Sequence, residues 1–210
     1  MKLSELLGAS SGVESTPFPD PAIDLPADPT GGPQSVVLGG GCFWCTEAVF
    51  NRLDGVISVV SGYAGGTAET ADYQSVCSGM TDHAEVIRVD YDASRISFGQ
   101  ILKVFFAVAH DPTQRNRQGN DMGRQYRSAI FYASINQEQV AEAYIRQLSD
   151  ATVFDQPIVT TLEPLRQFFA AEAYHQGFVA RNPAQPYVAA VAVPKVKKLE
   201  KSFPSKLKKS

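Results

Sequence analysis

The chain has 210 residues, 44% of them hydrophobic, which suits one globular domain with appendages. Its formal net charge of -3 gives no overall attraction to nucleic acid or to a membrane surface, and no apolar run approaches the length of a membrane span. Three cysteines, an odd number, argue against a secreted disulfide framework and favour a reducing compartment. We therefore expect a cytoplasmic protein with thiol chemistry.

Both ends of the chain are expected to be appendages. Residues 1–34 are rich in Ser, Pro, Gly and Asp, a composition that buries little apolar surface, so they predict a flexible or loosely docked N-terminal arm. From Lys195 onward, seven lysines face a single Glu200, which predicts a solvated, weakly ordered basic tail over residues 195–210. The catalytic domain is then expected to be residues 35–194.

The segment that carries the first cysteine has a distinctive order. An apolar, β-branched run at Val36–Leu38 stops at three glycines, and Cys42 follows at once. This predicts a strand, a glycine turn and a helix to about Leu53, with Cys42 at the start of the helix. Unpaired N–H groups and the helix dipole favour an anion there, so the pKa of the Cys42 thiol is expected to be lowered. The alternative is that Cys42 is a small buried hydrophobe.

The rest of the chain mixes strands and helices without strict alternation, which favours an α+β fold: a single two-layer domain with a mixed central sheet. The polar segment 113–124 is too long for a simple connector and predicts a functional loop. The expected strands are residues 56–63, 83–91, 126–133 and 158–162. The expected helices are residues 97–109, with Ser97 as N-cap, 137–148 and 165–169, with a brief turn at 73–77 and coil after 183.

Cys42 and Cys45 form a Cys-x-x-Cys pair at the predicted helix start, where two sulfurs three residues apart could bond. Three chemistries remain open: a dithiol oxidoreductase, a zinc site, and a peroxidatic-type thiol with Cys45 as resolver. Zinc has the least support, because only Cys77 and His83 are on offer as further ligands. We interpret Cys77 as a core-packing residue.

Other side chains could serve a reactive sulfur. Phe43 and Trp44 flank Cys42 and could either anchor the core or form an apolar pocket for a small substrate group. Glu85 lies in an expected strand and, on pattern alone, is a solvated residue; burial would raise its pKa and make it a general acid. Tyr73 and Tyr126 lie in or beside loop-rich segments, and their spacing alone assigns them no role.

Several short segments, taken together and in order, resemble the A-type peptide methionine sulfoxide reductases over roughly residues 35–200. The combination of Gly-Cys-Phe-Trp, His-Ala-Glu and Gln-Tyr-Arg-Ser is highly specific. Small departures are Asp82, where the family usually has Gly, and Thr70-Ala71-Asp72, where Asn-Pro-Thr is common. The matching segments are Gly39–Trp44, Ser61–Gly66, Tyr73–Gly79, His83–Val86, His110–Thr113, Gly119–Asp121, Gln125–Ser128 and Tyr174–Gln176.

The resemblance implies reduction of the S-epimer of methionine sulfoxide, free or in oxidised proteins, as repair under oxidative stress. It implies that Cys42 attacks the sulfoxide sulfur and that Glu85 is the protonated acid. Tyr73 and Tyr126 would donate hydrogen bonds to the sulfoxide oxygen. These roles fit the chemistry, because an oxygen leaves sulfur readily only when positioned donors and a proton meet its growing charge.

The resemblance also implies that Phe43 and Trp44 enclose the substrate methyl group, with Asp121 in a supporting role near the site. No metal, flavin or nicotinamide is required, and no motif for a cofactor is present. Neither nucleic acid nor a membrane is expected as a partner, and we expect a monomer.

Recycling of the cysteine departs from familiar patterns. Reduction of a sulfoxide leaves a sulfenic acid on Cys42 that a second thiol must reduce. Val188 stands where relatives often carry a cysteine, and no cysteine follows Cys77, which excludes a C-terminal relay. We expect Cys45 to attack the sulfenic acid and thioredoxin to open the disulfide, with direct reduction by another thiol as the alternative.

Two other classes of function remain at this point. A thioredoxin-like dithiol oxidoreductase shares the strand, turn and Cys-x-x-Cys helix, but it would act on disulfides and not on sulfoxides. A non-catalytic binding module whose basic tail docks acidic partners would be insensitive to Cys42→Ser.

Overall fold

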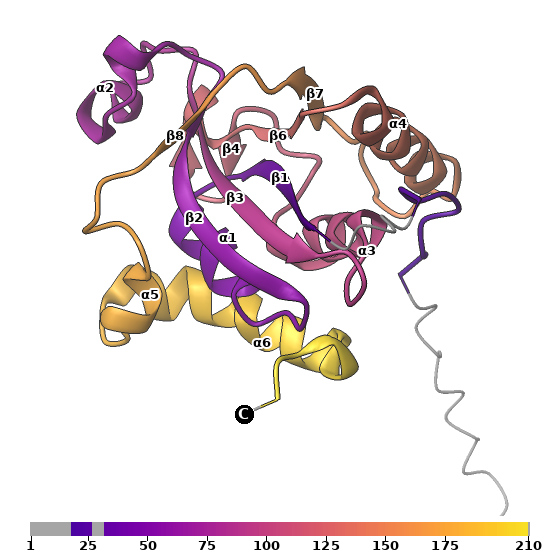
Figure 1. Cartoon of the computed structure of the whole chain (residues 1–210). Coiled ribbons are helices and arrows are strands. Elements are labelled where there is room, and N and C mark those ends of the chain that lie inside the picture. Colours follow the sequence, from indigo (N-terminus) through magenta and orange to yellow (C-terminus); the bar gives the residue numbers. More distant parts are fainter. Residues whose placement is uncertain (1–17, 27–31, 210) are drawn as a thin grey trace, which may run out of the picture.

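The computed structural model describes residues 18–26 and 32–209, and a six-stranded sheet forms its centre (Figure 1). The strand order is β7-β6-β1-β3-β2-β8, with all neighbours antiparallel except the parallel pair β6 and β7. A small ribbon of β4 (Arg117–Gln118) and β5 (Asp121–Met122) lies within the polar loop. This mixed sheet confirms the α+β prediction. The six strands are β1 (Pro33–Gly40), β2 (Val56–Ala64), β3 (Ala84–Asp92), β6 (Ser128–Tyr132), β7 (Thr161–Pro164) and β8 (Phe168–Ala170).

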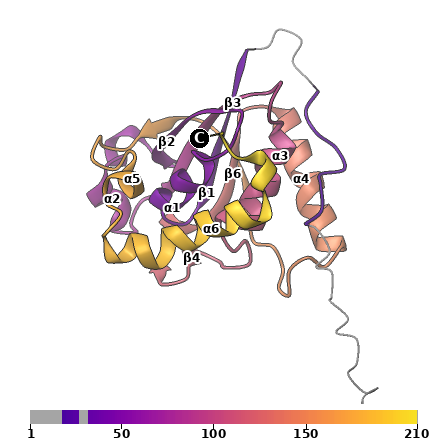
Figure 2. The same cartoon turned by 90° about the horizontal axis from the view of Figure 1, so that it is seen from below.

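Helices cover the sheet, and α1 lies between the sheet and α6 (Figure 2). Ser97 caps α3 as predicted, in a reciprocal capping box with Gln100. The helices are α1 (Phe43–Phe50), α2 (Tyr73–Cys77), α3 (Phe98–Val104), α4 (Ile135–Asp150), α5 (Phe178–Arg181) and α6 (Val193–Ser202). Two π-helical turns, Phe105–Ala109 and Val188–Ala192, continue α3 and precede α6, and 3-10 turns occupy Ala68–Thr70, Arg124–Tyr126 and Pro204–Lys206.

The central strands are apolar on both faces. Leu38 of β1 and Ile87 of β3 belong to the main core, which the sheet shares with α1, α3 and α4. Their chain neighbours Val37 and Val86 belong to a second, smaller cluster. Because successive side chains of a strand point to opposite faces, both faces of the sheet are buried at its centre. A polar side chain on these strands is therefore withdrawn from water.

Gly62 of β2 permits the close approach of the edge strand β8. A Cβ atom at this position would lie 2.3 Å from the carbonyl oxygen of Phe169 and 2.5 Å from the ring of Phe168. We expect Gly62→Ala to lower the free energy of unfolding by about 1–3 kcal/mol, because backbone must move to admit the methyl group. Gly32→Ala is the matched control, since no atom lies within 4 Å of its Cβ position. Urea denaturation measures both, and equal stability of the two variants would contradict this account.

Two expectations for the second half of the chain are wrong. The helix expected at 165–169 is absent, because Phe168–Ala170 pairs with β2 as an edge strand. The expected coil after residue 183 and the expected solvated tail are instead packed against the domain over their described part: the chain is helical from Val188 to Ser202, Leu199 is fully buried, and Leu53 forms a β-bridge with Leu207. The lysines dominate the composition of this segment, and they conceal the apolar stripe that packs α6 against the domain.

The described part of the N-terminal arm is docked on α3 and α4. The carboxylate of Asp24 accepts hydrogen bonds from the amide of Gly99, at 2.8 Å, and from the hydroxyl of Ser97. The hydroxyl of Tyr144 donates to the carbonyl of Pro19 at 2.7 Å. Residues 1–17 and 27–31 of the expected arm lie outside the described residues.

Candidate active site

The end of β1 positions the first cysteine. β1 ends at Gly40 and α1 begins at Phe43, so Cys42 is the N-cap residue of α1, as the sequence predicts. Gly41 has φ +84°, a conformation that favours glycine and turns the chain from strand to helix. The carbonyl of Cys42 accepts the first helical hydrogen bond, from Cys45 at 3.1 Å. Cys42 is 7% exposed and lies just beyond the C-terminal end of the central strand β1.

The order of the strands brings Glu85 and Tyr126 to the same end of the sheet as Cys42. β1 is antiparallel to both β3 and β6, so its last residues meet the first residues of those two strands. Gly40 pairs with Ser128, the first residue of β6, and Tyr126 lies two residues before it. Glu85, near the start of β3, accepts a hydrogen bond from the amide of Phe43 at 3.1 Å. Segments far apart in sequence therefore meet beside Cys42.

Glu85 is a buried acid. Its side chain is 2% exposed, and burial, followed by repulsion from Cys42, raises its pKa well above 4.5. The interpretation of this residue as solvated is wrong, because β3 is a central strand covered on both faces. A carboxyl group in this environment keeps its proton to higher pH than an exposed one, and the protonated state is the one a general acid needs.

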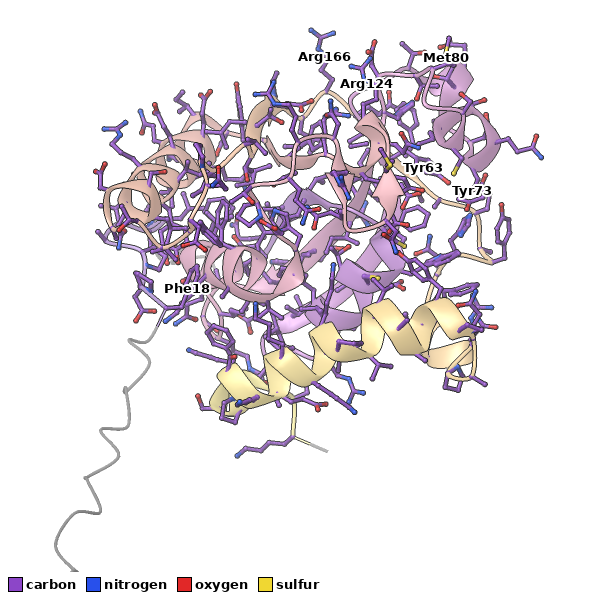
Figure 3. All side chains as sticks on the ribbon, turned by 180° about the vertical axis from the view of Figure 1, so that it is seen from behind. Phe18, Tyr63, Tyr73, Met80, Arg124 and Arg166 are labelled. Atoms are coloured by element: carbon purple, nitrogen blue, oxygen red, sulfur yellow. The ribbon has the colours of Figure 1, made fainter. Side chains whose placement is uncertain are left out.

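Two tyrosines, Tyr126 and Tyr73, lie near Glu85 and Cys42. Burial raises the pKa of Tyr126, and the charges of Glu85 and Cys42 raise it further. Burial likewise raises the pKa of Tyr73 on α2, with contributions from a hydrogen bond to Cys77 and from Glu85 and Cys42. Both hydroxyls therefore keep their protons and serve as hydrogen-bond donors. Figure 3 shows Tyr73 and Tyr63 at one end of the molecule, remote from Phe18.

The electrostatics of the two sulfurs differ from the prediction. The pKa of Cys42 is raised well above 9.0, first by its hydrogen bond to Cys45, then by burial. The pKa of Cys45 is lowered, chiefly because the Cys42 thiol donates to it. The predicted helix-terminus effect on Cys42 is outweighed, and the amide of Phe43 already serves Glu85. Of the two thiols, Cys45 is therefore the one that loses its proton more readily.

Cys45 lies at the centre of a contact network that the sequence did not predict. It is fully buried, and Val188 and Ala192 of the second π-helical turn pack on it. Its thiol donates to the hydroxyl of Tyr187, with 3.9 Å between sulfur and oxygen. The hydroxyl of Tyr187 in turn donates to Asp121 at 2.5 Å. Asp121 reaches the site through this tyrosine, and no local pattern around Tyr187 marks its role.

The aromatic residues beside Cys42 are held by groups from the C-terminal part of the chain. The indole N–H of Trp44 donates to Nδ1 of His175 at 3.1 Å, and its ring stacks on Phe178 with a centroid distance of 3.8 Å. Phe43 is buried, 5.0 Å from the His175 ring, whereas Trp44 is half-buried. His175 also lies 4.4 Å from the ring of Tyr73. The sequence offered His175 only as part of a matching segment and gave it no function.

Buried polar groups fix the C-terminal segment against the sheet. The carboxylate of Glu47 on α1 accepts from the amide of Gly177 at 2.9 and 3.0 Å. The side-chain amide of Gln176 pairs with both backbone groups of Ser61 in β2, each at 2.9 Å. Glu47 was not among the predicted residues, because a lone carboxylate in an amphipathic helix is usually solvated.

Cys77 is not a core residue. It is half-buried at the end of α2 and forms hydrogen bonds with the hydroxyls of Tyr73 and Tyr126. Burial raises its pKa, and the charges of Glu85 and Cys42 add to this effect. The interpretation of Cys77 as core packing is therefore wrong, because it belongs to the same group of side chains as the two phenols.

The motif histidines support the backbone. His83 is fully buried; its Nε2 lies 2.9 Å from the carbonyl of Thr67, and its Nδ1 accepts from the amide of Gly66. His110 lies 2.6 Å from the hydroxyl of Ser128, and burial lowers its pKa to about 3, so it is neutral. Within residues 18–26 and 32–209, no group of three His, Cys, Asp or Glu side chains is arranged to hold a metal ion.

Comparison with known proteins identifies the family. The family model for peptide methionine sulfoxide reductase matches residues 34–207. Peptide methionine sulfoxide reductase MsrA 2 from Synechocystis sp. is 51% identical over 91% of this chain and 90% of its own length. The MsrA protein of Deinococcus radiodurans is 51% identical over 83% of this chain and 84% of its own length. The chain belongs to the peptide methionine sulfoxide reductase family.

Solved structures of reductases have the same fold. Mxr1 from Saccharomyces cerevisiae in reduced form aligns with a TM-score of 0.66 at 32% identity, covering 76% of this chain and 91% of its own. Methionine sulfoxide reductase A of Corynebacterium diphtheriae aligns with a TM-score of 0.64 at 33% identity, covering 81% and 87%. Membership of this reductase family sets aside both the thioredoxin-like and the non-catalytic binding hypotheses.

Proposed function

We propose that this reductase acts on the S-epimer of methionine sulfoxide, free or in oxidised proteins, with Cys42 as nucleophile and Glu85 as acid. The observation that carries the proposal is the buried Glu85 beside Cys42. Tyr73 and Tyr126 lie close enough that charge on Glu85 or Cys42 raises the pKa of each phenol. An assay with the two purified sulfoxide epimers tests it. Turnover of the R-epimer at the rate of the S-epimer would contradict the assignment.

The site supports a balanced oxygen transfer. Tyr73 and Tyr126 bind the sulfoxide oxygen, and Glu85 supplies a proton as negative charge grows on it. The sulfur of Cys42 attacks the substrate sulfur as a thiolate and so gives up its own proton, which restores the Glu85 carboxyl. The S–O bond of the substrate breaks as the S–S bond to Cys42 forms, and the oxygen, protonated a second time by Glu85, leaves as water. Attack of water on the Cys42 sulfur then breaks the S–S bond, which releases methionine, leaves a sulfenic acid on Cys42 and returns a proton to Glu85. No electrons are supplied from outside in this step.

The aromatic residues beside Cys42 orient the substrate in this proposal. Trp44 is half-buried beside Cys42, and His175 and Phe178 fix its ring in place. Phe43 packs behind it in the core. We assign the methyl group of the sulfoxide to the apolar surface that these two rings provide, with Asp121 supporting the site through Tyr187.

Recycling is assigned to Cys45. Its sulfur is within hydrogen-bond reach of Cys42, and its lowered pKa makes loss of its proton easier when it attacks a sulfenic acid. The resulting disulfide requires an external dithiol, for which thioredoxin is the proposed donor. The cysteines at positions 42, 45 and 77 are unpaired, which supports the proposal of a reducing, cytoplasmic setting. We also propose that the chain acts as a monomer.

Disulfide mapping tests the recycling step. After one equivalent of methionine-S-sulfoxide, mass spectrometry of wild-type protein is expected to show a Cys42–Cys45 disulfide. Cys45→Ser is expected to stop at the sulfenic acid, which dimedone labels on Cys42. A free Cys45 in the oxidised wild-type protein would exclude this route.

Among the described residues, no helix is both long and apolar enough to cross a membrane.

A further inference from the structure

Formation of the Cys42–Cys45 disulfide requires groups that accept and donate protons, in addition to the two sulfurs. When Cys45 attacks the sulfenic acid on Cys42, a thiol proton must leave Cys45 and hydroxide must leave Cys42. Cys45 is fully buried under Val188 and Ala192, so bulk water does not serve as its base. Besides Cys42, the only hydrogen-bond partner of its thiol that the structure records among the described residues is the hydroxyl of Tyr187.

That hydroxyl is already oriented toward a base. Tyr187 donates to Oδ2 of Asp121 at 2.5 Å, a short charge-assisted contact, while its oxygen accepts from the Cys45 thiol at 3.9 Å. The Cys42 sulfur lies close enough to accept a hydrogen bond from the same hydroxyl when that hydroxyl is not donating to Asp121. The edge of its ring packs against Trp44, with centroids 6.0 Å apart. One phenol therefore touches both redox sulfurs and one carboxylate.

We propose that Tyr187 and Asp121 form a proton relay that activates Cys45 for attack on the Cys42 sulfenic acid; this inference rests on the proposed recycling by Cys45. The Cys45 thiol passes its proton to the Tyr187 oxygen as the Tyr187 proton moves to Asp121. The Cys45 thiolate then forms the S–S bond, and the S–O bond of Cys42 breaks.

The relay returns its proton in the same step. The proton held by Asp121 passes back through Tyr187 to the departing hydroxide, which leaves as water. The balance is one sulfenic acid and one thiol giving one disulfide and one water, so no additional oxidant or reductant is consumed. The Cys45 sulfur is oxidised, and the Cys42 sulfur is reduced by the same amount.

Tyr187→Phe tests the relay because it removes one oxygen and keeps the ring that packs on Trp44. Rapid-quench experiments with one equivalent of methionine-S-sulfoxide separate two rate constants: methionine formation, and conversion of dimedone-reactive Cys42 to the disulfide. We expect the second rate constant to fall at least tenfold more than the first. A purely structural defect would instead slow both steps together.

Two further variants complete the test. Asp121→Asn keeps a hydrogen-bond acceptor for Tyr187 but cannot take its proton, so the same selective loss is expected. Tyr132→Phe, which removes a phenol that hydrogen-bonds Glu138 on the surface, is the matched control and should leave both rate constants at their wild-type values. Disulfide formation at the wild-type rate in both Tyr187→Phe and Asp121→Asn would overturn the relay. Absence of a Cys42–Cys45 disulfide in the wild-type protein would instead overturn the recycling proposal itself.

Discussion

Cys42→Ser is expected to abolish methionine formation from methionine-S-sulfoxide, with no residual turnover above that of the reductant alone. A serine hydroxyl does not ionise near neutral pH and is a far weaker nucleophile toward sulfur than a thiolate. The other two thiols do not compensate. Cys45 is fully buried, and burial and neighbouring charge raise the pKa of Cys77. The measurement is methionine released per enzyme, with circular dichroism as the control for folding.

Variants of the two cysteines also report on the interaction between the sulfurs of Cys42 and Cys45. Because the Cys42 thiol lowers the pKa of Cys45 by donating to it, Cys42→Ala, which removes this donor, should raise the pKa of Cys45. Cys45→Ser should lower the pKa of Cys42, because the first cause of its elevation is removed. Thiolate absorbance against pH measures both. Unchanged titration in both variants would show that the sulfurs are not in contact.

Much of the fold followed from local pattern. The glycine turn between Leu38 and Cys42, the Ser97 cap and the short helix at 73–77 are each set by residues close in sequence. The edge strand β8 is different, because Phe168 and Phe169 become a strand only by pairing with β2. Such pairing depends on residues more than a hundred positions away, as Ala64 and Phe168 are, and no short window contains it.

The candidate site divides in the same way. The sequence pattern indicated Cys42 as reactive, but Glu85 gained its role only from the family resemblance. Its burial depends on β3 lying between β1 and β2, which is a property of sheet order. The raised pKa of Cys42 has a similar origin, because it depends on where Cys45 and the surrounding core lie. Tyr187 reaches Cys45 from 142 residues away, and no spacing rule predicts that contact.

Glu85→Gln is the second variant with a large expected effect, a loss of roughly 10²–10⁴ in kcat/KM, the range that a positioned general acid contributes. Glutamine keeps the size and one acceptor for the amide of Phe43, but it has no proton to give to the sulfoxide oxygen. Glu142→Gln, on an exposed face of α4, is the matched control and should retain full activity.

The pH profile distinguishes loss of the acid from loss of structure. The reactive state has one proton shared by two groups, with Glu85 protonated and Cys42 ionised. kcat/KM of the wild-type enzyme should therefore be bell-shaped. Both limbs of the profile lie at higher pH than they would for exposed groups. Burial raises the pKa of Glu85 above 4.5, and contacts with Cys45 raise the pKa of Cys42 above 9.0. In Glu85→Gln the acidic limb from the carboxyl group disappears, and only ionisation of the thiol remains. An acidic limb that persists unchanged in this variant would assign the proton to another group.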